Sequence, residues 1–163
     1  MTAFYVEASA LVKHYLPEAG SDVLSELLTV PPAGDRFHTS LLSMVEVTSA
    51  IRRQVRGGRL TERTAGASLA AFRTTLTGSF NTWRLGDDTV GAAVRVAEMH
   101  SLRAGDAIHL ATALAITPLV SPHRLVMVSS DNDLFQAAGV AGLGVLDPAG
   151  PDALARLRRL RAS

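Results

Sequence analysis

Short, fully apolar runs alternate along this chain with longer segments of helical periodicity. Ala3–Val6 and Leu125–Val128 are the clearest of these runs, and an acidic or polar residue follows each one directly. Strands that are buried on both faces of a parallel sheet have this composition, because helices cover the sheet on both sides. The pattern therefore predicts an α/β fold around a mostly parallel sheet of four to five strands, with further strands at Phe37–Leu41, Thr82–Leu85 and about residues 145–146.

Apolar spacing and end signals predict helices between these strands. Thr61 is predicted to cap the start of one helix, and Asp88 to cap another that runs to His100. Asp106 is predicted to open an apolar helix that Pro118 stops. Other helices are expected over residues 9–15, 21–28 and 133–138. A further helix is expected after the second predicted strand and should end at about residue 55.

Length and composition favour one globular domain. The chain has 163 residues, of which 47% are hydrophobic, which is enough to bury a core. We expect a single domain over residues 1–148 and an Arg-rich C-terminal helix or tail over residues 149–163. Cysteine is absent, which excludes disulfides and thiolate metal sites and suits a cytoplasmic protein. No signal peptide or bilayer-spanning segment is evident in the sequence.

Basic residues are clustered although the net charge is only +1. Lys13 is the only lysine, so the basic residues are almost all Arg. Guanidinium groups suit bidentate recognition of phosphate or carboxylate. The alternative is a solvated helix face together with a frayed basic tail. The two clusters are Arg52, Arg53, Arg56, Arg59 and Arg63, and Arg156, Arg158, Arg159 and Arg161.

Four acidic residues border the predicted core. Glu7 and Asp131 follow two apolar strands, and ligands of parallel sheets bind outside the carboxyl ends of the strands. Glu46 and Asp106 lie in or at the head of apolar helical patterns. Buried carboxylates are costly without a partner, and a divalent cation is the commonest partner of several together. Hard oxygen ligands favour Mg²⁺ or Mn²⁺.

Each acid also has an alternative explanation. Glu7 could face solvent in a turn, and Glu46 could pair with Arg53. Asp106 and Asp131 each stand near a helix start, where capping alone would explain an Asp. Asp133 is expected in the first turn of a helix, and His109 is expected to be a packing residue.

Phosphodiester hydrolysis is the chemistry that such a cluster suits, because a divalent cation relieves carboxylate repulsion and activates water for in-line attack. Motifs of other enzyme classes are missing. No Gly-rich dinucleotide fingerprint follows the first strand, and Lys13 has no P-loop context. The chain also lacks a G-x-S-x-G nucleophile elbow.

Four segments in order resemble the PIN-domain superfamily, and more closely its VapC-type ribonuclease toxins. They are residues 4–13, Val45-Glu46-Val47, residues 102–113 and residues 128–134, and the similarity extends over about residues 2 to 148. The resemblance implies a three-layer α/β/α fold and a metal-dependent endoribonuclease that acts as the toxin of a VapBC-type toxin–antitoxin pair. It also implies a homodimer and a cognate VapB-type antitoxin whose C-terminal segment lies over the active site.

Carried over by position, the resemblance makes Glu46, Asp106 and Asp131 metal-binding acids, and Glu7 takes the place of the family's first acid. Ser9 becomes a hydroxyl near the metal, and Asp133 matches a position that is often acidic. The first acid of the family is usually Asp, so Glu7 is a departure. Its extra methylene moves the carboxylate by roughly a bond length, and Mg²⁺ demands near-ideal octahedral geometry.

Three functions remain open at this point. We expect an endoribonuclease in which Glu7, Glu46, Asp106 and Asp131 hold Mg²⁺ or Mn²⁺, and whose RNA substrate is structured with an exposed loop. A catalytically weak PIN fold that binds RNA or protein is the alternative, and Glu7 is its direct support. A nuclease of DNA flaps is less favoured, because the chain has no extra clamp or helical arch.

Overall fold

The computed structural model describes residues 2–29 and 31–162, so Met1, Val30 and Ser163 lie outside the described residues. Its centre is a five-stranded sheet in the order β3-β2-β1-β4-β5, and every strand pairing is parallel. This confirms the predicted α/β class. The strands are β1 (Ala3–Val6), β2 (Arg36–Ser40), β3 (Phe80–Trp83), β4 (Leu125–Val128) and β5 (Gly144–Leu146).

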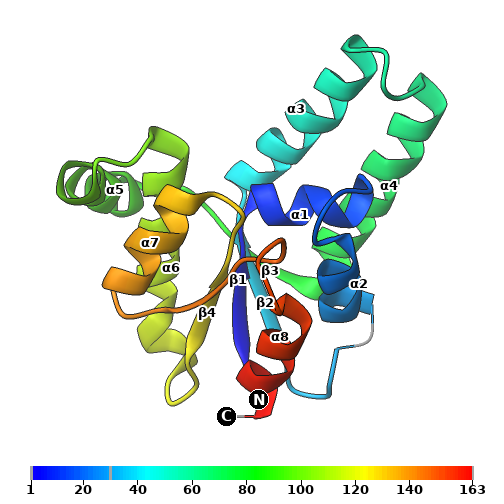
Figure 1. Cartoon of the computed structure of the whole chain (residues 1–163). Coiled ribbons are helices and arrows are strands. Elements are labelled where there is room, and N and C mark those ends of the chain that lie inside the picture. The colour runs from blue at the N-terminus through cyan, green and yellow to red at the C-terminus, as the bar shows by residue number, and fades with distance from the viewer. Residues whose placement is uncertain (1, 30, 163) are drawn as a thin grey trace.

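Helices cover both faces of the sheet and complete the three layers (Figure 1). Alternate residues of β1 point into two separate cores, Phe4 and Val6 into one and Ala3 and Tyr5 into the other. The first core is closed by α1 (Ala8–Tyr15), α2 (Ser21–Thr29), α3 (Leu42–Arg56), α4 (Glu62–Ser79) and α8 (Ala153–Ala162). The second is closed by α5 (Asp87–His100), α6 (Ala104–Val120) and α7 (Asn132–Val140).

The strand register brings the ends of β1, β4 and β5 together at one edge of the sheet. Val6 lies beside Val128, which in turn lies beside Leu146. The backbone N–H of Glu7 donates to Val128 O at 3.0 Å, and that of Ser129 donates to Leu146 O at 3.1 Å. The first residues after these strands are therefore neighbours in space, although more than a hundred residues separate Glu7 from Ser129.

Several predicted boundaries are wrong by a few residues. The third strand begins at Phe80 and not at Thr82, because Phe80 pairs with Phe37 of β2 and packs at a tilt against its ring, with the centroids 5.6 Å apart. Gly86, and not Asp88, is the N-cap of α5. The helix over 104–120 begins two residues before Asp106.

Pro118 does not stop that helix, which continues to Val120. A proline removes only one backbone hydrogen bond when it lies this close to a helix end, so two more residues can remain helical. Thr61 caps α4 as predicted, since its hydroxyl accepts the backbone N–H of Thr64 at 3.1 Å.

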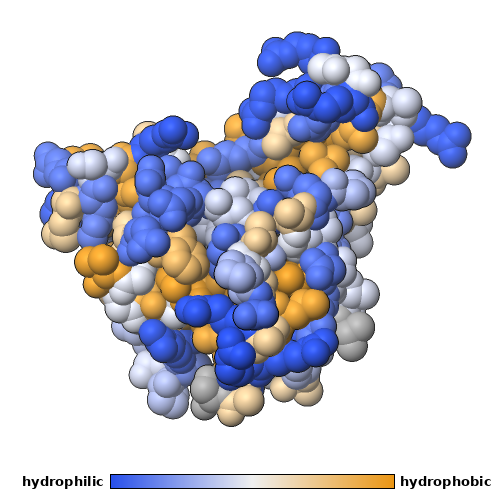
Figure 2. Space-filling view, viewed as in Figure 1, coloured by the Kyte–Doolittle hydropathy of each residue, from blue (hydrophilic) through white to orange (hydrophobic). Residues whose placement is uncertain are grey.

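The two Arg clusters lie in different parts of the fold, one on the C-terminal helix and one between α3 and α4. Arg158 of α8 donates to both carboxylate oxygens of Glu26 at 2.9 and 2.8 Å, and Arg161 donates to Asp35 at 2.8 Å. These pairs attach the C-terminal helix to α2 and the loop after it. The other cluster lies where α3 passes into α4, on a projecting hairpin whose far end is covered mainly by hydrophilic residues (Figure 2). In the described part of the chain, no helix is long and apolar enough to cross a membrane.

Candidate metal centre

Glu7 is held by three donors at the junction of β1 and α1. It is the N-cap of α1, and one carboxylate oxygen accepts the backbone N–H of Ser9 at 2.9 Å. The other oxygen accepts the hydroxyls of Ser9 and Ser129, the latter at 3.1 Å. The residue is 4% exposed, so it does not face solvent in a turn. Its longer side chain is thus accommodated by reaching Ser129 at the end of β4.

The same serines connect the ends of β1 and β4. Ser9 Oγ accepts the backbone N–H of Ser130 at 3.0 Å, and Ser129 Oγ accepts that of Asp131 at 3.0 Å. Asp131 caps α7, because its Oδ1 accepts the backbone N–H of Leu134 at 3.0 Å. Capping uses only one oxygen of that carboxylate, so the other can serve a ligand.

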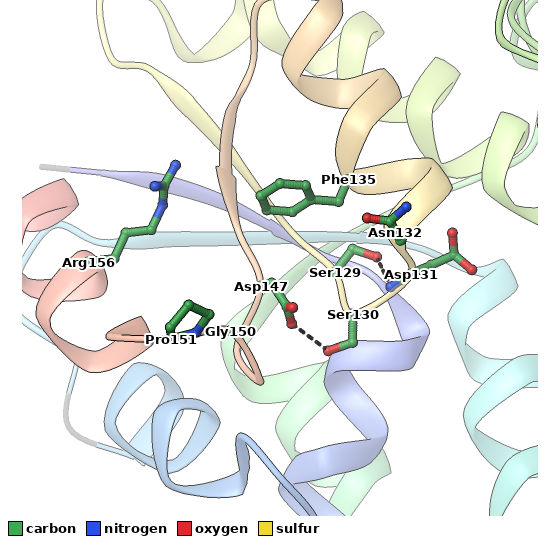
Figure 3. A pocket seen from close by; sticks show the side chains of 9 residues that line it. All are labelled: Ser129, Ser130, Asp131, Asn132, Phe135, Asp147, Gly150, Pro151 and Arg156. Atoms are coloured by element: carbon green, nitrogen blue, oxygen red, sulfur yellow. Dashed lines mark hydrogen bonds between the residues drawn. The ribbon is translucent and has the colours of Figure 1, made fainter.

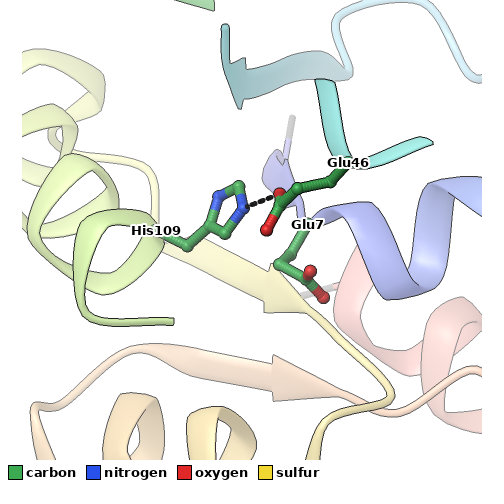
Figure 4. A group of neighbouring side chains, drawn as sticks. All are labelled: Glu7, Glu46 and His109. Carbon is green, nitrogen blue, oxygen red and sulfur yellow. Dashed lines mark hydrogen bonds and ion pairs between the residues drawn. The ribbon is translucent and has the colours of Figure 1, made fainter. Parts of the chain in front are cut away.

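Glu46 reaches the site from α3 and contacts His109 of α6, while Glu7 approaches from β1 (Figure 4). His109 Nε2 lies 2.7 Å from Glu46 Oε2, and His109 Nδ1 lies 2.9 Å from the Tyr5 hydroxyl. Burial raises the pKa of Tyr5 far above its ordinary value, so its hydroxyl stays protonated. In the neutral imidazole, Tyr5 then donates to Nδ1 and Nε2–H donates to Glu46.

This arrangement differs from the two simple alternatives for these residues. Arg53 donates to Ser49 Oγ at 2.8 Å rather than pairing with Glu46. His109 is fully buried, but it is more than a packing residue, because it orients the Glu46 carboxylate. Gly105 leaves room for that carboxylate, since a Cβ on Gly105 would lie 3.0 Å from Glu46 Oε1.

The pKa of Asp106 reflects its burial and the acidic residues around it. Desolvation, followed by the charges of Asp131, Glu7 and Glu46, raises the pKa of Asp106 from 3.8 to about 6, while His109 opposes the shift. Within the described residues, its carboxylate makes no hydrogen bond or ion pair. A carboxylate surrounded by like charges and without a partner is the environment that a cation relieves.

The donor set fits a hard divalent cation. Ligand-type atoms of Glu7, Glu46 and His109 lie within 4.8 Å of one another, and the charges of Asp106 and Asp131 act on the same space. Because Tyr5 and Glu46 engage both ring nitrogens of His109, the carboxylates are the groups that can bind a cation here. None of the four acids forms a Lys or Arg ion pair with the described residues. Asp133, by contrast, is exposed in the first turn of α7.

Sequence reasoning did not assign a role in the site to His109 or Ser129. Both had a signal. His109 is three residues after Asp106 and so lies next to it along the helix. Ser129 directly follows β4 just as Glu7 directly follows β1, which places both at the same edge of the sheet.

Comparisons with known proteins agree with this architecture. Residues 4–140 match the PIN domain family. The crystal structure of PAE2754 from Pyrobaculum aerophilum has a TM-score of 0.62 and 20% identity, over 99% of this chain and 97% of that one. A toxin–antitoxin complex from Klebsiella pneumoniae has a TM-score of 0.59 and 22% identity, over 91% of this chain and 98% of that one.

VapBC2 from Rickettsia felis, solved with a DNA fragment from its promoter, has a TM-score of 0.58 and 10% identity, over 88% of this chain and 97% of that one. At such identities the likeness shows a shared fold. No curated protein matches the sequence significantly.

Proposed function

This chain belongs to the PIN-domain family, and we propose that it is a metal-dependent endoribonuclease that acts as the toxin of a VapBC-type toxin–antitoxin pair. The observation that carries the proposal is the convergence of Glu7, Glu46, Asp106 and Asp131 at the carboxyl edge of the sheet, where burial and then the neighbouring carboxylates raise the pKa of Asp106. PIN domains are typically metal-dependent nucleases, and an acidic cluster of this kind suits that chemistry.

Each residue of the cluster has a distinct part in the proposal. Glu7, Glu46, Asp106 and Asp131 would hold one or two Mg²⁺ or Mn²⁺ ions. When bound, such an ion supplies positive charge that activates water and stabilises charge on the phosphate oxygens. Ser9 and Ser129 keep the Glu7 carboxylate in place, and His109 fixes the orientation of Glu46. Asp133, which is exposed in the first turn of α7, is proposed as a further acid near the site.

Cleavage of RNA by the purified, antitoxin-free protein tests the proposal. We expect cutting of a structured RNA with an exposed loop in Mn²⁺ or Mg²⁺, and no cutting in EDTA. Asp106→Asn should abolish the activity, whereas Glu98→Gln, an exposed acid on α5, is the matched control and should leave it intact. Cleavage by Asp106→Asn at saturating metal would show that the mechanism is wrong.

Glu7 supports a second candidate function, that of a catalytically weak binding module. Its carboxylate is already engaged by Ser9 and Ser129, as in a residue that stabilises the junction rather than binding metal. A catalytically weak RNA- or protein-binding module would bind RNA without metal and yield no product even in Mn²⁺. Glu7→Asp separates the two cases, because activity that appears only in this variant would identify a site disabled at one residue.

The partners belong to the same proposal. Structures with this fold include a toxin–antitoxin complex and VapBC2, which supports an antitoxin partner for this chain. We propose a VapB-type antitoxin and a homodimer in the cytoplasm. The large apolar side chains that α5 exposes, among them Val90 and Val94, offer an apolar surface for such contacts.

A further inference from the structure

A pocket of about 300 Å³ lies directly beside the acidic cluster, around the end of the edge strand β5. Its lining includes Ser129 and Asp131, so it adjoins the candidate metal centre. Figure 3 shows Phe135 of α7 and Arg156 of α8 on opposite sides of β5 in this pocket. Asp147, which follows β5, completes the polar side of the pocket.

Among the described residues, no other aromatic ring packs against the Phe135 ring in this pocket. Phe135 is half-buried and lies outside both hydrophobic cores. Every other Phe, Tyr and Trp of the chain packs against a further aromatic or imidazole ring. An aromatic face without such a neighbour, in a pocket lined by both apolar and polar groups, is suited to stacking a nucleic-acid base.

Arg156 is held in place with its charge uncompensated. Its Nε donates to Val145 O of the edge strand at 2.9 Å, which leaves its two terminal nitrogens for a ligand. Arg158 and Arg161 of the same helix are paired with Glu26 and Asp35, whereas Arg156 has no acidic partner in the described part of the chain. A fixed, unpaired guanidinium suits a phosphate group.

Asp147 adds an oriented acceptor. Its Oδ1 accepts the Ser130 hydroxyl at 3.1 Å and the backbone N–H of Ala149 at 2.9 Å. Its Oδ2 makes no hydrogen bond with the described residues and can accept an N–H group. A carboxylate of this kind accepts from the amino group of a base such as cytosine.

We propose that this pocket binds the RNA nucleotide next to the scissile phosphate, a proposal that rests on the ribonuclease function above. The base stacks on Phe135, its amino group donates to Asp147, and Arg156 binds a backbone phosphate. The pocket therefore favours a base that carries an amino group over uracil. It also gives the acidic cluster a neighbouring positive charge for a polyanionic substrate.

Fluorescence anisotropy with labelled single-stranded RNA hexamers tests this pocket in the Asp106→Asn background, where cleavage does not interfere. We expect Phe135→Leu to weaken binding about tenfold, because base stacking is lost, while Phe135→Tyr retains it. Arg156→Gln should weaken binding by a similar factor. Arg159→Gln is the matched control, because Arg159 is exposed on the same helix and lies outside the pocket. Oligo(C) should bind more tightly than oligo(U).

Thermal unfolding establishes that each variant is folded before its affinity is compared. If the wild-type protein cuts RNA, but Phe135→Leu and Arg156→Gln leave binding unchanged in the Asp106→Asn background and leave cutting unchanged when Asp106 is present, the pocket proposal is wrong and the ribonuclease stands. If the variants lose RNA binding although the wild-type protein cuts nothing in any metal, the ribonuclease proposal is wrong and the pocket remains an RNA-binding site. Equal affinity of Phe135→Leu and Phe135→Tyr would overturn the stacking role.

Discussion

His109 shows at the scale of one residue how a buried side chain can organise a cluster of acids. It contacts Glu46 with one ring nitrogen and Tyr5 with the other, so that a helix and a central strand together set the direction of one carboxylate. Partners of this kind around metal ligands affect metal affinity although they do not touch the ion. The side chain is fully buried, so its loss also leaves polar groups unpaired.

We therefore expect His109→Leu to lower both metal affinity and stability. Mn²⁺ affinity should fall roughly 10- to 100-fold, because Glu46 loses its orienting donor. The free energy of unfolding should fall by about 1–3 kcal/mol, because the buried Tyr5 hydroxyl loses its hydrogen bond to His109. Calorimetric Mn²⁺ titration and urea unfolding measure the two effects. Tyr5→Phe in the His109→Leu background removes that hydroxyl and should recover part of the stability but not the Mn²⁺ affinity.

The raised pKa of Asp106 predicts a pH dependence of stability in the metal-free protein. The folded state binds a proton at Asp106 more tightly than the unfolded chain, where the carboxyl titrates near 3.8. The resulting stabilisation is complete below that pH and is lost as the pH rises through about 6. The Tm of Asp106→Asn minus that of the wild type should therefore increase between these pH values. A difference in Tm that stays flat with pH, measured in EDTA, would contradict this prediction.

Most of the cluster could be predicted from sequence because its geometry follows from chain direction. Glu7 and Asp131 come just after apolar strands, and the carboxyl ends of parallel strands meet at one edge. The contact between His109 and Glu46 could not be predicted in this way. It depends on how two helices far apart in the sequence pack, and a single buried His in an apolar helix has no pattern that indicates its partner.

At the scale of elements, the C-terminal helix is bound to the domain by two different ion pairs. The side chains of Arg161 and Asp35 are 11% and 3% exposed, whereas that of Arg158 is 67% exposed. Arg161 also lies over the Phe4 ring, 5.8 Å from its centroid. Exposed pairs contribute little to stability, but removal of one partner of a buried pair leaves an uncompensated charge.

Arg161→Ala should accordingly destabilise the protein by about 3 kcal/mol, as expected for one half of a buried pair. Arg158→Ala, on the same helix, should shift the unfolding midpoint only slightly. Urea unfolding of the two variants compares them directly, and equal effects would show that burial does not distinguish the pairs.

The division into residues 1–148 and 149–163 remains a proposal. The C-terminal helix α8 packs against the rest of the chain, because its residues Ala153 and Leu157 are part of the first core.

The boundaries of elements were harder to predict than their existence, and α6 illustrates why. Arg103 is in the extended conformation at the N-cap although it has no side-chain capping bond, so tertiary packing, and not a cap signal, determines where the helix begins.

At the scale of the whole molecule, the proposal requires a partner. A small protein encoded next to this chain should co-purify with it and suppress its ribonuclease activity. Affinity purification after co-expression, followed by a cleavage assay before and after removal of the partner, measures both effects. If the neighbouring product neither binds nor inhibits, the role as a toxin is wrong, while the nuclease chemistry is unaffected.

The strand order also determines when during protein synthesis the acidic cluster can form. β4 lies between β1 and β5, although its residues are made long after those of β1. Chains leave the ribosome from the N-terminus, so β1 cannot pair with β4 until residues 125–128 have been translated. Asp131 can join Glu7 only after β4 has emerged and inserted. A ribosome that translates this protein therefore carries a chain with an incomplete cluster until β4 has emerged.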